Sequence, residues 1–310
     1  YIKFQIFNNN QLCHKSSSLY KSLKKIEIEK KHWQKIISKV RKKKKIILEP
    51  FDQDSYEFCK KFKKFVLIKI SSTEHDNDLL IKDALKNFNK VFFNISGFEI
   101  NYLMKYFKSL KNPKKKLVLM YGYQSFPSEP KYLRLNILSE IKKKGYVSGY
   151  ADHSDTSNEA LTYFATKKSI ELGAKYIEKH ITLNRDKKKP DYISSFSVND
   201  FENYFNFFKK ENLEWIQDKN LTTSNKEKLY CNLMNKFAVT KKNIDKDEKI
   251  DLKKIKFLRT GKKGINRHSI EKFLKKNKKY QLSLSKNIVN QSKHFKKFEN
   301  KQKKKGCFFR

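Results

Sequence analysis

The sequence is poor in cysteine, glycine and proline, with 4, 8 and 5 of them among 310 residues. So little glycine and proline excludes a collagen-like or linker-rich chain. Cys13, Cys59, Cys231 and Cys307 are far apart and form no CxxC pair, so we expect neither a zinc site nor a disulfide framework. No apolar run approaches the roughly 20 residues that span a bilayer, and no signal peptide is visible. We therefore predict a cytoplasmic protein with no membrane partner.

Acidic residues are scarce relative to basic ones. The chain has 72 Lys and Arg against 32 Asp and Glu, a formal net charge of +40. A basic surface attracts nucleic-acid backbones and small anionic substrates alike. No known nucleic-acid motif accompanies the charge, so we expect a solvated lysine surface rather than a nucleic-acid partner. An aromatic content of 14% argues against intrinsic disorder.

Short apolar runs alternate with longer amphipathic stretches along most of the chain. The runs are rich in β-branched and aromatic residues, which is typical of buried parallel strands. Strands are predicted at 2–7, 46–49, 66–70, 91–95, 117–121, 146–149 and 176–180, and helices near 33–43, 54–62, 77–87, 99–109, 131–143, 158–172 and 199–211. No glycine-rich loop follows an early strand, which argues against an open doubly wound sheet. The repeat therefore predicts an α/β fold, the (β/α)8 TIM barrel.

Seven βα units are recognisable, whereas a closed barrel normally has eight. The chain opens within a strand, at Tyr1 rather than Met, so we expect the first strand of the barrel to be missing from this sequence. The periodicity stops in the polar stretch DKNLTTSNK. We predict a barrel domain at 1–218, a linker at 219–226, a small second domain at 227–290 with strands at 237–240 and 255–258, and a basic tail at 291–310.

Polar side chains stand near the carboxyl ends of several predicted strands, the face that carries the active site in this fold. Lys3 and Gln5 are two residues apart on the first strand, so both point to the same side. Lys69 lies in the otherwise apolar strand VLIKI, where a lysine costs free energy unless it meets an anion. Two lysines that converge from different strands predict an anionic substrate.

Two histidines follow or end neighbouring strands. His153 lies in GYADHS, and His180 lies in YIEKHITL. Adjacent strand ends bring the two imidazoles within reach of one ion, and histidine is the commonest ligand of transition metals. We therefore predict an open, catalytic metal site with water in the remaining positions.

Several segments, in the same order along the chain, resemble those of the sialic acid synthases (N-acetylneuraminate synthases). GYADHS and GAKYIEKHITL resemble their YSDHT-like and IEKHFTLDR-like segments, and YIKFQIF, EPFD and LIKISSTE resemble VKFQ, TPFD and KIASGE. LMYGYQSFPSEP is similar to their segment ending in NYP, and NRDKKKPDYISS is similar to their LDR and GPD segment. Residues 234–265 resemble their C-terminal antifreeze-like (SAF, β-clip) domain. The resemblance covers about residues 1–285.

This resemblance implies a transferase of carbohydrate biosynthesis. Such an enzyme condenses phosphoenolpyruvate with an N-acylated amino-hexose, typically N-acetylmannosamine, to give a nine-carbon 2-keto sugar acid and phosphate. It implies a divalent metal, Mn²⁺ with Mg²⁺ as the alternative. A legionaminic or pseudaminic acid synthase would share this chemistry. The alternative from another class is an inactive basic barrel that binds nucleic acid.

The resemblance also assigns roles to matching residues. Lys3, Lys69 and Ser72 are expected to bind phosphoenolpyruvate. His153 and His180 are expected to bind the metal.

Two catalytic carboxylates are expected from the same match. Glu178 would lie beside the metal, and Glu74 would hold sugar hydroxyls together with Gln5 and Asp191. Gln124 is expected to bind substrate and stands where asparagine is usual in the NYP segment.

One arginine is expected from the second domain. Arg259, in FLRTGKKG, matches the arginine that the antifreeze-like domain supplies to the partner subunit's sugar site, which implies a domain-swapped homodimer. Departures from the family pattern include the absence of an NHNG-like segment, Glu49 in place of a threonine and Ala151 in place of a serine. They leave the identity of the amino sugar open.

Overall fold

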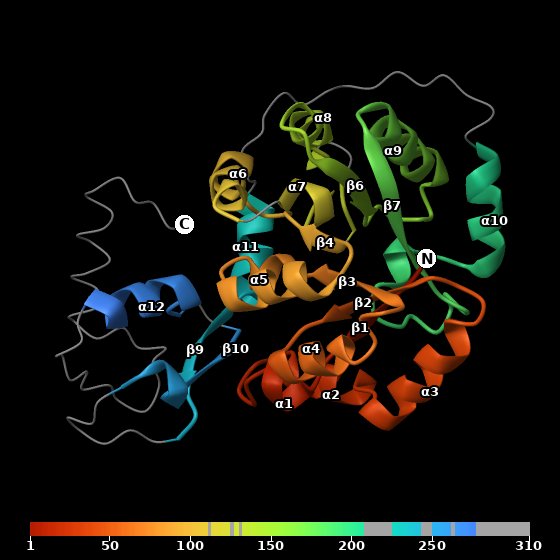
Figure 1. The fold of residues 1–310 in the computed structure, drawn as a ribbon. Helices are drawn as coiled ribbons and strands as arrows, with labels where there is room; N and C mark the ends of the chain where they lie inside the picture. The colour runs from red at the N-terminus through yellow and green to blue at the C-terminus, as the bar shows by residue number, and fades with distance from the viewer. Residues whose placement is uncertain are drawn as a thin grey trace.

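Eight parallel strands form one curled sheet in the computed structural model, which describes residues 1–110, 113–124, 127–129, 132–207, 225–242, 250–261 and 264–276. Each strand is hydrogen-bonded to its neighbours in the chain, in the order β1 to β8 (Figure 1). The strands are β1 (Ile2–Ile6), β2 (Ile46–Pro50), β3 (Val66–Ile70), β4 (Val91–Asn94), β5 (Leu117–Tyr121), β6 (Val147–Asp152), β7 (Ala174–Ile181) and β8 (Ser195–Phe196). This arrangement confirms the predicted α/β barrel class.

Helices occupy the connections between strands and cover the outside of the sheet (Figure 1). In α3, Trp33 and Ile37 are one turn apart and both buried, and the Trp33 ring packs 5.5 Å from that of Phe4 on β1. The helical elements are α1 (Asn9–Leu12), α2 (Tyr20–Ile26), α3 (Lys30–Val40), α4 (Gln53–Lys60), η1 (Ser72–Glu74), α5 (Asp78–Asn87), α6 (Ile100–Lys108), α7 (Pro113–Lys116), α8 (Asn136–Lys143), α9 (Glu159–Glu171), η3 (Tyr192–Ser194) and α10 (Val198–Phe207).

The seven predicted strands are all present, and the structure adds an eighth. The added strand, β8, has two residues, too few for a periodic pattern to show. Among the described strands, β1 and β8 form the two edges of the sheet. The short helices α1 and α2 lie in a region where no helix was predicted. Helix α3 ends at Val40, earlier than predicted, because the basic run Arg41–Lys45 has no apolar face to continue it.

Residues along each strand alternate between the helix layer and the barrel interior. On β2, Ile46 and Leu48 belong to the core between sheet and helices, whereas Ile47 packs inside the barrel. The inner apolar cluster is formed by Ile47, Phe92, Val118, Met120 and Ala151. On the inward face of these strands, the residue two positions after an apolar one is charged. Glu49 follows Ile47 on β2 in this way, and Lys69 follows Leu67 on β3. The interior therefore has an apolar layer followed by a charged layer at the carboxyl end.

A second, smaller unit follows the barrel. It consists of α11 (Asn225–Met234), β9 (Lys236–Thr240), η4 (Leu252–Lys254), β10 (Ile255–Arg259) and α12 (Arg267–Lys276), with β9 and β10 antiparallel. Its own core contains Ala238, Ile250, Ile255, Ile265, Ile270 and Phe273. In Figure 1 its strands and α12 lie to the left of the barrel, and strand β10 contacts α1. That this C-terminal unit is an antifreeze-like domain stays a prediction. Part of the predicted linker (219–224) and the whole basic tail (291–310) lie outside the described residues.

Helix α11 packs against the barrel and connects it to the rest of the C-terminal unit. Arg134 Nη2 lies 2.5 Å from Glu227 Oε2, and both side chains are at most 4% exposed. Gly97, at φ 81°, lies so close to Cys231 that a Cβ at this position would come within 2.3 Å of the Cys231 sulfur. A glycine is therefore required where the helix crosses this loop.

No helix in the described part of the chain is long and apolar enough to cross a membrane.

Candidate active site

Two lysines and two glutamates form a cluster inside the barrel, near the carboxyl ends of the strands. Lys3 on β1 and Lys69 on β3 both donate to Glu178 on β7, with Lys3 Nζ 2.8 Å from Oε1 and Lys69 Nζ 2.7 Å and 2.9 Å from the two carboxylate oxygens. Lys3 Nζ also donates to Glu49 Oε2 on β2 at 2.8 Å, and Lys69 Nζ lies 3.7 Å from Glu49 Oε1. The structure thus brings together three predicted residues and adds a fourth, Glu49.

Each charge in this cluster depends on its opposite neighbours, because burial alone disfavours ionisation. Burial opposes the charged form of Lys3, but Glu178 and Glu49 outweigh it and raise the pKa of Lys3 above its ordinary value. Burial would also raise the pKa values of Glu49 and Glu178, yet Lys3 and Lys69 overcome this and lower both. With two ammonium groups and two carboxylates, the cluster has no formal net charge.

His153 and His180 lie side by side at the ends of β6 and β7, with ring centroids 5.5 Å apart. Nδ1 of His153 is 3.1 Å from the carbonyl oxygen of Tyr123. Because a carbonyl can only accept, this nitrogen carries the proton and Nε2 keeps the lone pair. Burial lowers the pKa of His153 to about 4, and burial with the neighbouring His153 lowers the pKa of His180 to about 3. Both imidazoles are therefore neutral at pH 7, the form that binds metals.

Glu74, at the end of η1, is held from the C-terminal unit. Lys236, the first residue of β9, pairs with Glu74 Oε1 and also donates to the backbone carbonyl of Phe51. Asn77 Nδ2 donates to Glu74 Oε2 at 2.7 Å. Burial favours the neutral acid, but Lys236 outweighs it and the pKa of Glu74 is lowered. This predicted carboxylate is therefore buried and ionised at the contact between barrel and C-terminal unit.

Three other predicted residues are Gln5, which contacts the charged cluster, and Ser72 and Gln124, which are buried near strand ends. Gln5 Nε2 lies 3.4 Å from Glu49 Oε2, so Gln5 shares the inner face of β1 with Lys3 as predicted. Ser72 is buried in η1, and Gln124 is buried just beyond β5.

Asp191 lies in the connection between β7 and β8, and Arg259 lies at the end of β10 in the C-terminal unit. Asp191 has a left-handed backbone at φ 63°, and its Oδ2 lies 3.9 Å from His180 Nδ1. Arg259 on β10 is buried, with its guanidinium carbon 5.1 Å from the ring centre of Phe51, and its carbonyl accepts from the backbone N–H of His14 at 3.1 Å. The structure thus places Arg259 against its own chain. The contribution of Arg259 to a partner subunit stays a prediction.

Sequence reasoning did not name two residues of this region, Glu49 and Lys236, as site residues. Glu49 carried a usable signal, because it is an acidic residue at the end of the apolar strand IILEP. Lys236 carried no signal, since its contact with Glu74 joins residues 162 positions apart in the chain.

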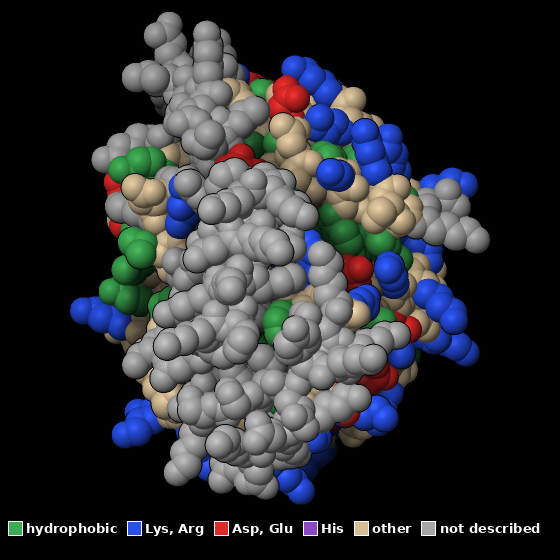
Figure 2. Space-filling model, turned by 90° about the vertical axis from the view of Figure 1, so that its left-hand side faces the viewer, with side chains coloured by type: hydrophobic (Ala, Val, Ile, Leu, Met, Phe, Trp, Pro, Cys, Tyr) green, Lys and Arg blue, Asp and Glu red, His purple; other side chains and the backbone are tan. Residues whose placement is uncertain are grey.

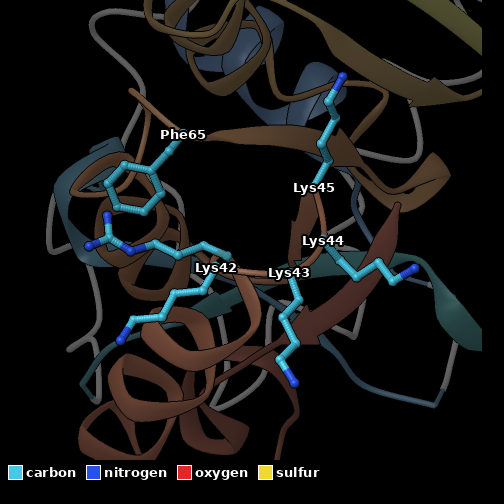
Figure 3. Close-up of a pocket in the computed structure, with 6 residues that line it drawn as sticks. Lys42, Lys43, Lys44, Lys45 and Phe65 are labelled. Carbon is cyan, nitrogen blue, oxygen red and sulfur yellow. The ribbon is translucent and has the colours of Figure 1, made fainter.

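A different basic feature lies at the opposite end of the barrel. Arg41, Lys42, Lys43, Lys44, Lys45 and Phe65 line an open hollow of about 540 Å³ at the loops that precede β2 and β3 (Figure 3). The labelled lysine side chains in Figure 3 point in different directions, so they do not converge on one small anion. On the side of the C-terminal unit, Figure 2 shows Lys and Arg side chains around the outline of the molecule, with fewer Asp and Glu side chains among them.

The fold and the polar residues at the strand ends define a class: a parallel α/β barrel with its site at the carboxyl end. Within this class, the sequence model of the NeuB family matches residues 1–219, and the chain belongs to this family. The predicted family resemblance is therefore confirmed. The match ends before the C-terminal unit.

Two curated proteins show related sequences. The uncharacterized protein MJ1065 of Methanocaldococcus jannaschii is 24% identical over 269 residues, which cover 84% of this chain and 76% of that protein. The spore coat polysaccharide biosynthesis protein SpsE of Bacillus subtilis is 24% identical over 213 residues, which cover 64% of this chain and 55% of that protein.

Solved structures share the fold at low sequence identity. The crystal structure of SpsE from Bacillus subtilis has a TM-score of 0.69 at 19% identity, covering 87% of this chain and 79% of that one. The N-acetylneuraminic acid (sialic acid) synthetase of Leptospira borgpetersenii serovar Hardjo-bovis, in complex with citrate, has a TM-score of 0.57 at 22% identity, covering 69% and 75%. These likenesses establish the barrel fold.

Proposed function

We propose that this protein is a cytoplasmic synthase that condenses phosphoenolpyruvate with an N-acylated amino-hexose to a nine-carbon 2-keto sugar acid and phosphate. The observation that carries this proposal is the pair of lysines, Lys3 and Lys69, held inside the barrel beside two neutral histidines. Membership of the NeuB family supports it.

The lysines would bind the phosphate and carboxylate groups of phosphoenolpyruvate through charge-assisted hydrogen bonds. Ser72, buried in η1, adds a hydroxyl to the same region. Glu178 already lies between the lysines, so an incoming anion shares them with this carboxylate. The enol carbon then forms a bond with the aldehyde carbon of the sugar, water adds to the resulting cationic carbon, and phosphate leaves.

The donor set at the ends of β6 and β7 fits a divalent metal. Nε2 of His153 is the nitrogen with the lone pair, because Nδ1 donates to Tyr123. Among the residues that the structure describes, no group of three or more His, Cys, Asp or Glu side chains has a metal-binding arrangement, so His153 and His180 would be the two protein ligands. Manganese or magnesium bound there would polarise the sugar aldehyde as a Lewis acid.

The acceptor sugar would lie further toward the mouth of the barrel, against Gln5, Glu74, Gln124 and Asp191. The C-terminal unit would contribute Arg259, in the same chain or, in a domain-swapped homodimer, in the partner's. Within this chain Arg259 is buried next to the end of β2, where it contacts Phe51.

Phosphate release tests this function directly. The protein is incubated with phosphoenolpyruvate, Mn²⁺ or Mg²⁺, and a panel of N-acylated amino-hexoses that includes N-acetylmannosamine and the precursors of legionaminic and pseudaminic acids. We expect release that requires both substrates, with a 2-keto acid product of matching mass. Lys69→Met should abolish it and the exposed Glu57→Gln should not. Absence of release with every sugar and metal would contradict the proposal.

Nucleic-acid binding is a second candidate, favoured by the hollow at the amino end of the barrel. Arg41 stacks 4.5 Å over the ring of Phe65, which is 41% exposed, and an exposed ring among cations is a platform for unpaired bases. Steeply salt-dependent binding of arbitrary single-stranded DNA, without binding of phosphoenolpyruvate, would favour this function over the first.

A further inference from the structure

Glu49 is a carboxylate in the charged cluster to which no role has been assigned. Its side chain is 4% exposed, and it lies on the inner face of β2, across from Gln5 in the strand register. The contacts of Glu49 show what the charge does.

Glu49 contacts the same two lysines that would receive an anion. Its Oε2 accepts from Lys3 Nζ at 2.8 Å, and its Oε1 lies 3.7 Å from Lys69 Nζ, too far for a hydrogen bond but close enough for a strong charge interaction. Both lysines also contact Glu178, which accepts from Lys3 at the same 2.8 Å and lies closer to Lys69 than Glu49 does, at 2.7 Å. Each lysine would therefore keep a carboxylate partner even without the charge of Glu49.

The charge count shows the effect of this extra carboxylate. With Glu49 ionised, two lysines face two carboxylates, and the cluster is neutral. An anion that enters must compete with Glu49 for Lys3 and also lie within a few ångströms of a negative charge in a buried site, where repulsion is weakly screened. Without the charge on Glu49, the same cluster would carry one net positive charge.

We propose that Glu49 sets the affinity of this site for anions. Its carboxylate occupies the position at Lys3 that an incoming phosphate or carboxylate group would take, so anions bind more weakly than they would if Glu49 were neutral. That the natural anion is phosphoenolpyruvate rests on the function proposed above. The competition itself rests on the geometry of the four side chains and applies to any phosphate-bearing anion.

Calorimetric titration with inorganic phosphate and, separately, with phosphoenolpyruvate tests this role. The variants are Glu49→Gln, which keeps the shape and removes the charge, Glu49→Thr as a second neutral variant, and Glu49→Asp, which keeps the charge. Glu57→Gln on the surface of α4 is the matched control, and thermal melting verifies that each variant is folded.

We expect Glu49→Gln and Glu49→Thr to bind both anions about tenfold more tightly or better, while Glu49→Asp and Glu57→Gln stay near the wild type. A structural residue would not produce tighter binding on removal of its charge. Unchanged or weaker phosphate binding in the folded neutral variants, or no phosphate binding by any of the proteins, would overturn the inference. Tighter phosphate binding without any binding of phosphoenolpyruvate would uphold it and reject the proposed function instead.

Discussion

At the carboxyl end of the barrel Lys3 and Lys69 are enclosed and contact carboxylates, whereas at the amino end Arg41–Lys45 are exposed to solvent. Within the described parts of the chain, none of these five basic residues forms an ion pair. Lysine thus has two uses in one barrel. A buried lysine needs a fixed partner and can serve a site, while an exposed one needs only water.

The topology explains why exposed lysines gather at the amino end. In a parallel βα repeat, every helix that returns to the next strand ends near the start of that strand. Lysine near a helix C-terminus is stabilising because it complements the helix dipole. Helices α3, α4, α5, α6, α8 and α9 all carry lysine in their last turn. A basic amino end therefore arises from helix stability, before any ligand is considered.

The largest expected difference between the two ends concerns the histidines at the carboxyl end. His153→Ala and His180→Ala should each lower phosphate release by roughly a hundredfold or more and weaken manganese binding, because a polarising metal supplies several kcal/mol to such a reaction. The exposed His32→Ala is the control. Activity that survives both EDTA and these substitutions would contradict a metal role.

A paired substitution compares the two lysine environments directly. Lys69→Met should reduce the free energy of unfolding by about 3–5 kcal/mol, because it leaves buried carboxylates without their cation. Lys43→Met, on the exposed run, should change it by no more than about 0.5 kcal/mol. Urea unfolding of both variants measures this difference. Equal effects would mean that Lys69 is solvated in the free protein.

Acid should weaken the contact between Glu74 and Lys236. The folded-state pKa of Glu74 is below its ordinary value of 4.5, so its contribution to stability is complete above that pH and is lost as the pH falls further. The difference in unfolding free energy between wild type and Glu74→Gln should therefore narrow below about pH 4.5. Denaturant unfolding at several pH values between 6 and 3.5 (roughly the usable range) measures it. A difference that stays constant with pH would show that Glu74 is not ionised in the fold.

The smallest effect on synthesis is expected from the amino end. Replacing Lys42, Lys43, Lys44 and Lys45 together by Gln should leave phosphate release within about twofold, because surface changes away from a site have little effect. If single-stranded DNA binds there, the same variant should reduce the salt dependence of binding by about 0.7 per lost phosphate contact. A large loss of synthase activity in this folded variant would show that the two ends are not independent.

The hydrophobic periodicity and the positions of the strand ends were enough to predict much of the barrel and the two lysines of the charged cluster, while Glu178 was expected from the family resemblance. Lys3 and Lys69 lie on the inner face because strand alternation places them there, and Glu178 and His180 share one face of β7. His153 follows the last residue of β6. Gly173 follows the C-cap residue of α9 with a φ of 105°, the left-handed backbone that glycine commonly adopts after a helix.

What escaped prediction depends on contacts between distant parts of the chain. The strand β8 is defined by its pairing with β7, not by a pattern of its own. The partner of Glu74 comes from β9, and the partner of Arg134 comes from α11. Lys236 and Glu227 look like ordinary surface residues in the sequence. Their ion pairs with the barrel exist only because the C-terminal unit packs against it.

The apolar layer inside the barrel has a kinetic consequence. Ile47, Phe92 and Val118 fill the interior beneath the charged cluster, so an anion held by Lys3 and Lys69 occupies the deepest position available. Glu74 and Asp191 follow their strands by several residues and stand nearer the rim. A sugar bound there first would block the way to the lysines. For the synthase reaction proposed above, we therefore expect compulsory-order kinetics, in which the anionic substrate binds first and the inorganic phosphate formed from it departs last.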